Sequence, residues 1–454
     1  MRPEELQGKA VTVIGGGRSG LAVARLLVQA GARVFLTERE AAPAGLPGAL
    51  EAMGVAYEFG GHSPRALEAD FFVISPGVPS TINLVQQALR AGVPVYSEIE
   101  VASWFCRAPI VAITGSNGKT TTTSLLGHIF RTAGRRTIVA GNIGFPFSDY
   151  VLEAGPDDVV VLEVSSFQLD HVATFRPRVS LLLNITPDHL DRYNHDFSAY
   201  AHSKFRIFAN QREGDVLVYN EDDEVIRDYV RLERGKRAFR ALAFSLEKDV
   251  EAGAFVRDGA LVLRLQSHDE ILMQAERLAL RGRHNLYNSL AAAVAARVME
   301  VRNDVVRESL ATFEGVPHRL EFVRELDGVR YVNDSKATNV NSVWYALESF
   351  DEPIVLIAGG RDKGNDYTPL KPLVRQKVRT LIAIGESADK VLAELGPCVE
   401  QSMAARSMED AIRCARVFAQ PGDVVLLSPA CASFDMFENY EDRGDTFKRL
   451  VASL

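Results

Sequence analysis

Cysteines and long hydrophobic runs are both scarce in this sequence. The four cysteines among its 454 residues are Cys106, Cys398, Cys414 and Cys431. They form no CxxC pair and have no histidine cluster beside them, so neither a disulfide framework nor a structural zinc site is expected. No apolar run approaches the roughly 18 residues that span a bilayer, and the polar start lacks a signal-peptide pattern. We therefore expect a cytoplasmic protein with no membrane partner.

The chain also lacks an excess of positive charge. Its formal net charge is -8, whereas proteins that bind nucleic acid through phosphate contacts are usually basic, so we expect no nucleic-acid partner. Apolar residues make up 47% and charged residues 24% of the chain, which excludes long disorder, collagen-like repeats and coiled coil. At roughly 150 residues per domain, the length predicts about three domains.

Strand-like and helical runs alternate along the chain, which is typical of α/β proteins with mostly parallel sheets. We expect a Rossmann-like domain at 1–97, a central P-loop-type ATPase domain at 98–316 and a C-terminal Rossmann-like domain at 317–454. The expected strands include 10–14, 33–36, 110–113, 159–164, 179–185, 215–219, 329–332, 354–357, 380–384 and 424–427. Residues 254–265 predict a hairpin that turns at Asp258-Gly259.

A glycine-containing loop follows the expected strand at 110–113 and precedes a helical stretch. It reads Gly115-Ser116-Asn117-Gly118-Lys119-Thr120-Thr121. Its backbone amides and the helix start can surround phosphates, Lys119 can reach the β- and γ-phosphates, and Thr120 can ligate Mg²⁺. The loop is shorter than the standard pattern, because Ile113 occupies the position of the first glycine. We expect an ATP site; the alternative is an ordinary strand–helix turn with a surface lysine.

This short loop resembles that of the Mur ligase family, whose members use ATP to join amino acids to peptidoglycan precursors. Further motifs follow in the family's order: Gly141-Asn142-Ile143-Gly144, Glu163-Val164-Ser165-Ser166-Phe167-Gln168-Leu169, Asp188-His189-Leu190-Asp191-Arg192, His284-Asn285, Pro317-His318-Arg319, residues 333–339, residues 428–435 and Arg443-Gly444. The N-terminal unit, residues 333–339, 359–363 and 428–435 are similar to the branch that adds D-glutamate. The resemblance covers all three expected domains.

The resemblance implies a specific reaction. The substrates would be D-glutamate and UDP-N-acetylmuramoyl-L-alanine, and ATP would give ADP and phosphate. Because a carboxylate is a poor electrophile, the γ-phosphoryl group would first move onto it, and the acyl phosphate would then take the amine through a tetrahedral intermediate. Negative charge builds on the transferring group, so the site needs cations. We also expect a monomer whose domains move to close over ATP.

Four side chains are candidates to hold magnesium: Thr120, Glu163, His189 and Lys204. Glu163 ends an apolar strand, at the edge where open α/β sheets bind ligands; the alternative is a capping or salt-bridged glutamate. The resemblance implies two Mg²⁺ ions, one of them bound by His189, and a carbamylated Lys204. Without the resemblance, His189 would be a loop histidine and Lys204 a helix-surface lysine. The expected catalytic residues are Lys119, Asn142, Glu163, His189 and Lys204.

Further nucleotide contacts are expected outside the loop. Asn285 and Asn288 begin a helix and could simply cap it, but the resemblance places this segment near the adenine. It also implies that Arg319 and Asp334, on the third domain, hold ATP: Arg319 could supply charge to phosphates and Asp334 could accept from the ribose. Asn142 would lie near both the phosphates and the substrate, with a turn-forming asparagine as the alternative.

The segment Gly15-x-Gly17-x-x-Gly20 permits two interpretations. With Glu38 at the end of the next strand, it fits an NAD site, but the same geometry holds any pyrophosphate at a helix start. The resemblance implies the UDP-sugar instead. Its expected contacts are Arg18, Ser19, Glu38, Arg39, Ser75, Pro76, Gly77, Asn142 and His189.

D-Glutamate carries two carboxylates and therefore needs cations and hydroxyl groups. By resemblance the candidates are Lys336, Thr338, Lys363, Ser433 and Tyr440, and Tyr440 is expected to pack against the site. Each alone could be a solvated surface residue. The alternative functions are an NAD-dependent oxidoreductase, a folylpolyglutamate-synthase-like ligase and a non-catalytic nucleotide-binding protein.

Overall fold

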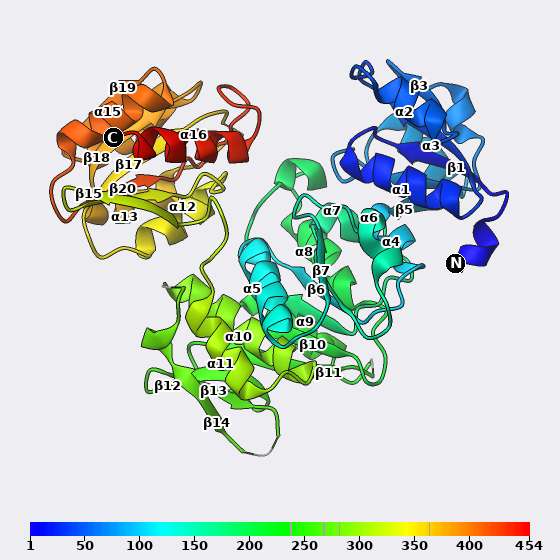
Figure 1. The fold of residues 1–454 in the computed structure, drawn as a ribbon, viewed down its shortest axis with the longest axis horizontal. Coiled ribbons are helices and arrows are strands. Elements are labelled where there is room, and N and C mark those ends of the chain that lie inside the picture. The colour runs from blue at the N-terminus through cyan, green and yellow to red at the C-terminus, as the bar shows by residue number, and fades with distance from the viewer. Residues whose placement is uncertain (237, 267, 281, 363) are drawn as a thin grey trace. The chain divides into compact units, whose positions relative to one another are not determined.

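A computed structural model describes residues 1–236, 238–266, 268–280, 282–362 and 364–454. The chain divides into two compact units, one formed by residues 1–278 with 287–312 and the other by residues 279–286 with 313–454. Three separate β-sheets form along the chain (Figure 1). This is the expected α/β class with three domains and mostly parallel sheets, although the exact domain boundaries remain a prediction.

The first sheet is entirely parallel, in the order β3-β2-β1-β4-β5. Its strands are β1 (Ala10–Ile14), β2 (Arg33–Glu38), β3 (Ala56–Phe59), β4 (Phe71–Ile74) and β5 (Val95–Ser97), with helices α1 (Arg18–Gln29), α2 (Leu46–Ala52) and α3 (Asn83–Arg90) (Figure 1). Side chains alternate between faces along a strand. Phe71 and Val73 therefore enter one core cluster, and Phe72 and Ile74 enter another. Both faces are covered, as a parallel sheet requires.

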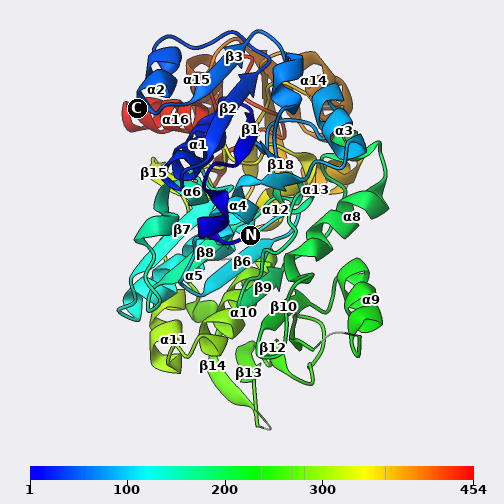
Figure 2. The same ribbon diagram turned by 90° about the vertical axis from the view of Figure 1, so that its right-hand side faces the viewer.

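The second sheet has the order β14-β13-β12-β11-β10-β9-β6-β8-β7. Its strands are β6 (Ile110–Thr114), β7 (Thr137–Gly141), β8 (Val159–Glu163), β9 (Val179–Leu182), β10 (Val216–Asn220), β11 (Arg240–Ser245), β12 (Gly253–Arg257), β13 (Ala260–Arg264) and β14 (Glu270–Gln274). Figure 2 shows the sheet running from β7 through β6 and β10 to β14. β12 pairs antiparallel with β13, and β13 pairs antiparallel with β14, which confirms the hairpin predicted at Asp258-Gly259.

Helices of the first unit connect these strands. They are α4 (Glu98–Ser103), α5 (Lys119–Thr132), α6 (Phe147–Tyr150), α7 (Ser166–Leu169), α8 (Phe197–Phe205), α9 (Glu224–Glu233) and α11 (Asn303–Thr312); α10 (Arg283–Val298) begins in the segment that belongs to the second unit. Local sequence explains several starts: Ser165 and Gln168 form a capping box at α7, and Asp196 caps α8.

The third sheet has the order β15-β16-β20-β17-β18-β19; β15 pairs antiparallel with β16, and the other described pairings are parallel. Its strands are β15 (Glu321–Leu326), β16 (Val329–Asn333), β17 (Ile354–Gly359), β18 (Val378–Ile384), β19 (Gln401–Ala405) and β20 (Val424–Leu427). The helices are α12 (Val340–Glu348), α13 (Lys371–Lys377), α14 (Ala388–Leu395), α15 (Met408–Phe418) and α16 (Tyr440–Ala452) (Figure 1). Successive residues of β17 and β20 again enter two separate cores.

Two buried glutamates anchor helix α4. The Glu100 carboxylate accepts hydrogen bonds from the backbone amides of Ala173, Thr174 and Phe175 and from the Trp104 indole. Glu98 is fully buried; its Oε1 accepts from the Ser148 amide at 2.6 Å, and its Oε2 has no hydrogen-bond partner in the described part of the chain. Burial raises the pKa of Glu98 to about 7.

The sequence located most strands, with differences at their ends. The strand predicted at 33–36 extends to Glu38, and the one predicted at 179–185 ends at Leu182. Strand β15 was not predicted, because charged residues interrupt its apolar pattern. Within the described ranges, no helix is both long and apolar enough to cross a bilayer.

Candidate active site

A pocket of about 500 Å³ lies within the first unit, at the carboxyl ends of β1 and β4. These neighbouring strands form the point where the strand order reverses, which is where open α/β sheets bind ligands. The pocket is lined by most of the residues predicted for the UDP-sugar: Arg18, Ser19, Glu38, Ser75, Pro76, Gly77 and Asn142. Arg39 and His189 are exposed and do not line this pocket, so their roles stay predictions.

The two walls of this pocket come from different parts of the chain. One wall is the first glycine-containing loop, and the other includes Gly141, Gly144 and Gln168 of the central region. A Cβ at Gly20 would lie 1.9 Å from the Gly15 carbonyl oxygen. The Gly-x-Gly-x-x-Gly segment is therefore needed for close packing of α1 against the strand end, whichever ligand it binds.

Glu38 is already engaged by backbone groups. Its Oε2 accepts from the Gly16 amide at 2.8 Å, and its Oε1 accepts from the Glu40 amide at 3.1 Å. Burial alone would raise the pKa of Glu38, but these amide hydrogen bonds hold it below its usual value. The carboxylate therefore stays ionised and fixes the shape of the loop. An NAD site needs a carboxylate that is free to accept hydrogen bonds from the ribose, and Glu38 is already engaged.

The predicted phosphate loop joins β6 to α5 as expected. Gly118 has φ +82° at the N-cap of α5, and a Cβ there would lie 2.4 Å from the Asn288 Oδ1 atom. The loop is fixed by Asn184, whose side chain accepts from the Asn117 amide at 2.8 Å and donates to the Asn117 carbonyl at 3.1 Å. Ser116 and Tyr200 hydroxyls lie 2.9 Å apart. The loop conformation is therefore specified by side chains from other elements.

Lys119 and Lys204 meet at one backbone oxygen. Each ammonium donates to the Gly115 carbonyl, at 2.8 and 2.9 Å respectively, and Lys119 also donates to the Ser116 carbonyl at 2.8 Å. Lys204 is only 2% exposed, so the helix-surface alternative for this residue is wrong. Its ammonium also lies 4.6 Å from the centre of the Tyr200 ring.

Lys204 has an unusual electrostatic environment. Burial, followed by the nearby Lys119 charge, holds the pKa of Lys204 well below its ordinary value. Asp188, Asp170 and Glu163 act in the opposite direction but do not reverse the effect. The amine is therefore easier to deprotonate than a surface lysine, which makes it a better nucleophile.

Glu163 ends β8 beside the phosphate loop. It pairs in register with Ile113 of β6, and its side chain is 2% exposed. Its Oε1 accepts a hydrogen bond from the Asn142 side-chain amide (Nδ2) at 2.9 Å. Its buried Oε2 has no hydrogen-bond partner among the described residues. The salt-bridge alternative is not supported, and the free oxygen suits a hard cation such as Mg²⁺.

His189 lies on a separate, exposed segment. It has φ +51°, and its Nε2 is 3.8 Å from the Asp188 carboxylate. The next turn places Arg192 over the Phe167 ring at 4.3 Å, and Arg192 donates to the Val78 carbonyl at 3.0 Å. Across the described residues, no group of three or more His, Cys, Asp or Glu side chains is arranged to hold a metal ion.

The predicted Asn285 and Asn288 are both buried on α10. Asn288 accepts from the Thr122 hydroxyl at 3.2 Å, which connects it to the first turns of α5. Asn285 belongs to the second unit, as does the neighbouring His284. Burial, with a further contribution from Arg319, lowers the pKa of His284 to about 3, so its ring is neutral.

The third sheet places three predicted segments on adjacent parallel strands. Lys336 and Thr338 follow β16, Ser433 follows β20, and residues 360–362 follow β17. Ser433 is buried, and Lys336, Thr338 and Tyr440 are half-buried, so none is a fully solvated residue. The Lys336 ammonium lies 5.1 Å from the centre of the Tyr440 ring. Lys363 lies outside the described residues.

Asp334 is fully buried at the start of the same segment. Its carboxyl accepts from the Ser428 hydroxyl at 2.8 Å and from the Leu320 amide at 3.2 Å. Burial raises the pKa of Asp334 to about 6, although Arg319 opposes this effect. The charge of the half-buried Arg319 therefore favours the ionised form of the Asp334 carboxyl.

Three residues with clear structural roles in these sites were assigned no role from the sequence: Asn184, Tyr200 and Gln168. Asn184 is the first polar residue after the apolar run 181–183, and that position at a strand end could have identified it. Gln168 lies inside the motif at residues 163–169, which could have identified it, whereas Tyr200 carries no comparable local signal.

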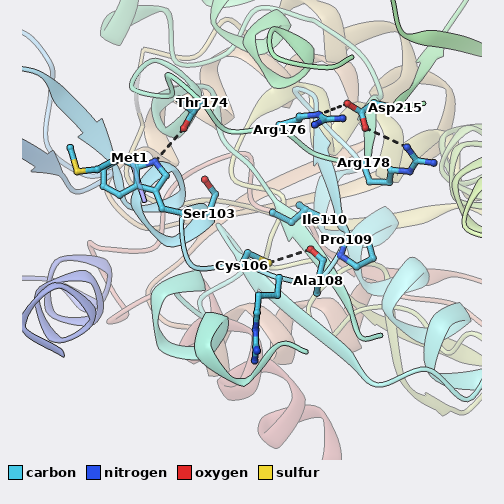
Figure 3. Close-up of a pocket in the computed structure, with 12 residues that line it drawn as sticks. Met1, Ser103, Cys106, Ala108, Pro109, Ile110, Thr174, Arg176, Arg178 and Asp215 are labelled. Carbon is cyan, nitrogen blue, oxygen red and sulfur yellow. Dashed lines mark hydrogen bonds and ion pairs between the residues drawn. The ribbon is translucent and has the colours of Figure 1, made fainter. Parts of the chain in front are cut away.

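A second pocket, of about 670 Å³, lies at the amino end of β6 (Figure 3). Arg176 and Arg178 line it, and both approach the buried Asp215 carboxylate, at 2.6 and 3.6 Å. Ile110 at the start of β6 lies in the same wall. The amino ends of parallel strands rarely bind substrates, and the two arginines already share a carboxylate, so this pocket is not the candidate active site.

Comparison with known proteins gives the same assignment along the whole chain. Family models described as "Mur ligase MurD-like, N-terminal domain", "Mur ligase middle domain" and "Mur ligase, glutamate ligase domain" match residues 9–97, 113–296 and 318–431. The chain belongs to the Mur ligase family. This Mur ligase is 66% identical over 459 residues to the UDP-N-acetylmuramoylalanine--D-glutamate ligase of Salinibacter ruber, with both chains fully covered.

Other relatives agree with this placement. The Mur ligase is 49% identical over 469 residues to the enzyme of the same name from Chloroherpeton thalassium, again over the full length of both. Among solved structures it is similar in fold to a pseudomurein peptide ligase type C from Methanothermus fervidus (TM-score 0.61, 20% identity, 98% and 100% of the two chains). It is equally similar to the UDP-N-acetylmuramate-alanine ligase of Thermotoga maritima (TM-score 0.60, 18% identity, 98% and 100%). The oxidoreductase alternative is not favoured.

Proposed function

We propose that this Mur ligase joins D-glutamate to UDP-N-acetylmuramoyl-L-alanine and converts ATP to ADP and phosphate. The observation that carries the proposal is the meeting of Lys119 and Lys204 at the Gly115 carbonyl, next to the strand that ends at Glu163. The Lys119 ammonium and the Glu163 carboxylate, whose Oε2 has no hydrogen-bond partner among the described residues, are groups that phosphoryl transfer to a carboxylate requires. The chain's similarity to D-glutamate ligases supports the choice of amino acid.

The residues divide the chemistry between them. The loop amides and Lys119 bind the ATP phosphates and stabilise the charge that develops during transfer. Mg²⁺ would neutralise phosphate charge when bound, and Thr120 and Glu163 are the side chains that would hold it. Asn142 orients Glu163 through its hydrogen bond and lines the pocket that would hold the UDP-sugar. Asn285, Asn288, Arg319 and Asp334 would complete the nucleotide site.

We further propose that Lys204 carries a carbamate and that two Mg²⁺ ions bind, the second near His189. In carbamylation, the neutral Lys204 Nζ forms a bond to the carbon of CO₂ and releases one proton. Its lowered pKa and its burial favour this reaction, because only the uncharged amine attacks. The product is an anion, which would lie beside the Lys119 ammonium and attract it.

The carbamate has a direct test. Lys204→Ala should lose activity and regain part of it with acetate or propionate, which can place a carboxylate in the vacated space. Wild-type enzyme in ¹³C-bicarbonate should show a carbamate carbon signal that Lys204→Ala lacks. Identical spectra for the two proteins, or no chemical rescue, would count against the modification. Lys248→Met, an exposed lysine change, is the control.

The proposed reaction has one decisive assay. Phosphate release should require ATP, UDP-N-acetylmuramoyl-L-alanine and D-glutamate together, and L-glutamate should not replace D-glutamate. We expect the enzyme to act as a cytoplasmic monomer. Phosphate release without the UDP-sugar, or tight NADH binding without UDP-sugar binding, would contradict the proposal.

A further inference from the structure

A buried arginine lies among the loops of the third sheet. Arg443 lies on the first turn of α16 and is 1% exposed. It is the largest fully buried side chain among the described residues. Within that part of the chain, no carboxylate forms an ion pair with it. Burial lowers the pKa of Arg443 to about 10, so the guanidinium remains charged at neutral pH. Burying a cation without an ion pair is costly, and here the nearby Asp435 and Asp334 charges offset part of that cost.

Its hydrogen bonds join two of the segments predicted to bind the amino acid. Nε donates to the Ser335 hydroxyl at 2.9 Å and Nη2 donates to the Ser335 carbonyl at 2.8 Å. Nη1 donates to the Cys431 carbonyl at 3.1 Å. Ser335 immediately precedes Lys336, and Cys431 lies two residues before Ser433. One planar group therefore sets the spacing of the loops that follow β16 and β20.

The third segment packs against the same guanidinium. A Cβ at Gly360 would lie 3.3 Å from Arg443 Nη1, and Gly360 has φ +134°. Arg361 and Ala432 exchange two backbone hydrogen bonds, at 2.9 and 3.1 Å. The Ser335 hydroxyl also donates to the Tyr440 carbonyl at 2.8 Å, which ties the start of α16 to this network. All three loops therefore converge on Arg443.

We propose that Arg443 is a positioning residue for the amino-acid substrate, holding Lys336 and Ser433 in register through its hydrogen bonds to the loops that follow β16 and β20. The inference rests on the proposed function. All its hydrogen-bond acceptors are carbonyl or hydroxyl oxygens, and the Asp435 and Asp334 carboxylates act on its charge without forming an ion pair. Arg443 itself is covered by the loops and acts through them.

The test compares substitutions of Arg443 with a matched change on the same helix. Arg443→Met should raise KM for D-glutamate at least tenfold, change kcat less than threefold, and leave KM for ATP and for the UDP-sugar within twofold. Arg443→Lys keeps the charge but not the planar fork, so it should recover part of the loss. Arg449→Met, at an exposed position of α16, should match wild type.

A milder variant covers the case in which Arg443→Met does not fold. Ser335→Ala removes one acceptor and leaves the charge, and should raise KM for D-glutamate about threefold with a normal melting transition. Equal rises in all three KM values, or an unchanged KM for D-glutamate in the folded variants, would overturn the inference. Wild-type enzyme without D-glutamate-dependent phosphate release would instead refute the proposed function, before any variant is compared.

Discussion

At the scale of single residues, the environment of Lys119 makes a clear prediction. Lys119→Met keeps most of the aliphatic stem but removes the ammonium that the Gly115 and Ser116 carbonyls hold in place. We expect kcat/KM to fall by about 100- to 1,000-fold, as is usual when one preorganised donor to a developing charge is lost. Phosphate release measures this effect, and Lys248→Met is the matched control. A fall of less than tenfold in a folded Lys119→Met enzyme would contradict the assigned role.

Glu163 gives a second prediction, about magnesium. Glu163→Gln preserves shape and an acceptor for Asn142 but removes the charge of the unpartnered Oε2 atom. The Mg²⁺ concentration for half-maximal activity should rise at least about tenfold, since even indirect partners of a metal contribute about 10- to 100-fold to its affinity. A magnesium titration measures this, with the exposed Glu224→Gln as control. An unchanged titration curve would remove Glu163 from the metal site.

The order of residue types along the chain identified Lys119 and Glu163 as candidate site residues. The burial of the Lys204 and Arg443 side chains could not be predicted in this way. The strand before Glu163 and the glycines around Lys119 are local features, so the sequence indicates them. The burial of Lys204 depends on how α8 packs against the loop at Gly115, which is a contact between residues far apart in the chain. Arg443 is similar, because its acceptors lie 12 and 108 positions away.

At the scale of elements, helix α4 should confer a pH-dependent stability. The folded protein raises the pKa of Glu98 from 4.5 to about 7, so the native state binds a proton that the unfolded state releases between these values. Stability from this group is therefore complete below about pH 4.5 and is lost as pH rises through about 7. The full effect is about 3 kcal/mol.

Glu98→Gln tests this linkage. The uncharged amide should make the variant progressively more stable than wild type as pH rises from 5 to 8.5, measured by urea unfolding of both proteins. The exposed Glu153→Gln should follow the wild-type curve. A constant difference between Glu98→Gln and wild type across this range would show that Glu98 does not titrate in the folded protein.

Strands could be predicted from the sequence where all their successive residues are buried. Strands such as β8 and β17 are apolar runs buried on both faces, and such runs stand out in the sequence. Strand β15 alternates with charges and is antiparallel at a sheet edge, so it carries no such run. Strand ends differed because tertiary contacts, rather than local preference, decide where pairing stops.

At the scale of the whole molecule, the candidate nucleotide residues are divided between two units. Lys119 and Glu163 belong to the first unit, and Arg319 and Asp334 belong to the second. If all of them bind one ATP molecule, adding nucleotide and substrates should restrict the motion of the units. Solution scattering should then show a smaller radius of gyration with Mg²⁺, ATP and UDP-sugar than without ligands. Lys119→Met should show a weaker change, and no compaction of the wild-type protein would contradict the prediction.

The pocket at the ends of β1 and β4 has a consequence for inhibitor design. Its first wall is a glycine-containing loop that many dinucleotide-binding enzymes share, but its second wall contains Asn142 and Gln168 from another part of the chain. A compound that contacts only the loop would also fit other enzymes that share this loop. One that also forms hydrogen bonds with those two side-chain amides would depend on residues outside the shared loop and would therefore gain selectivity.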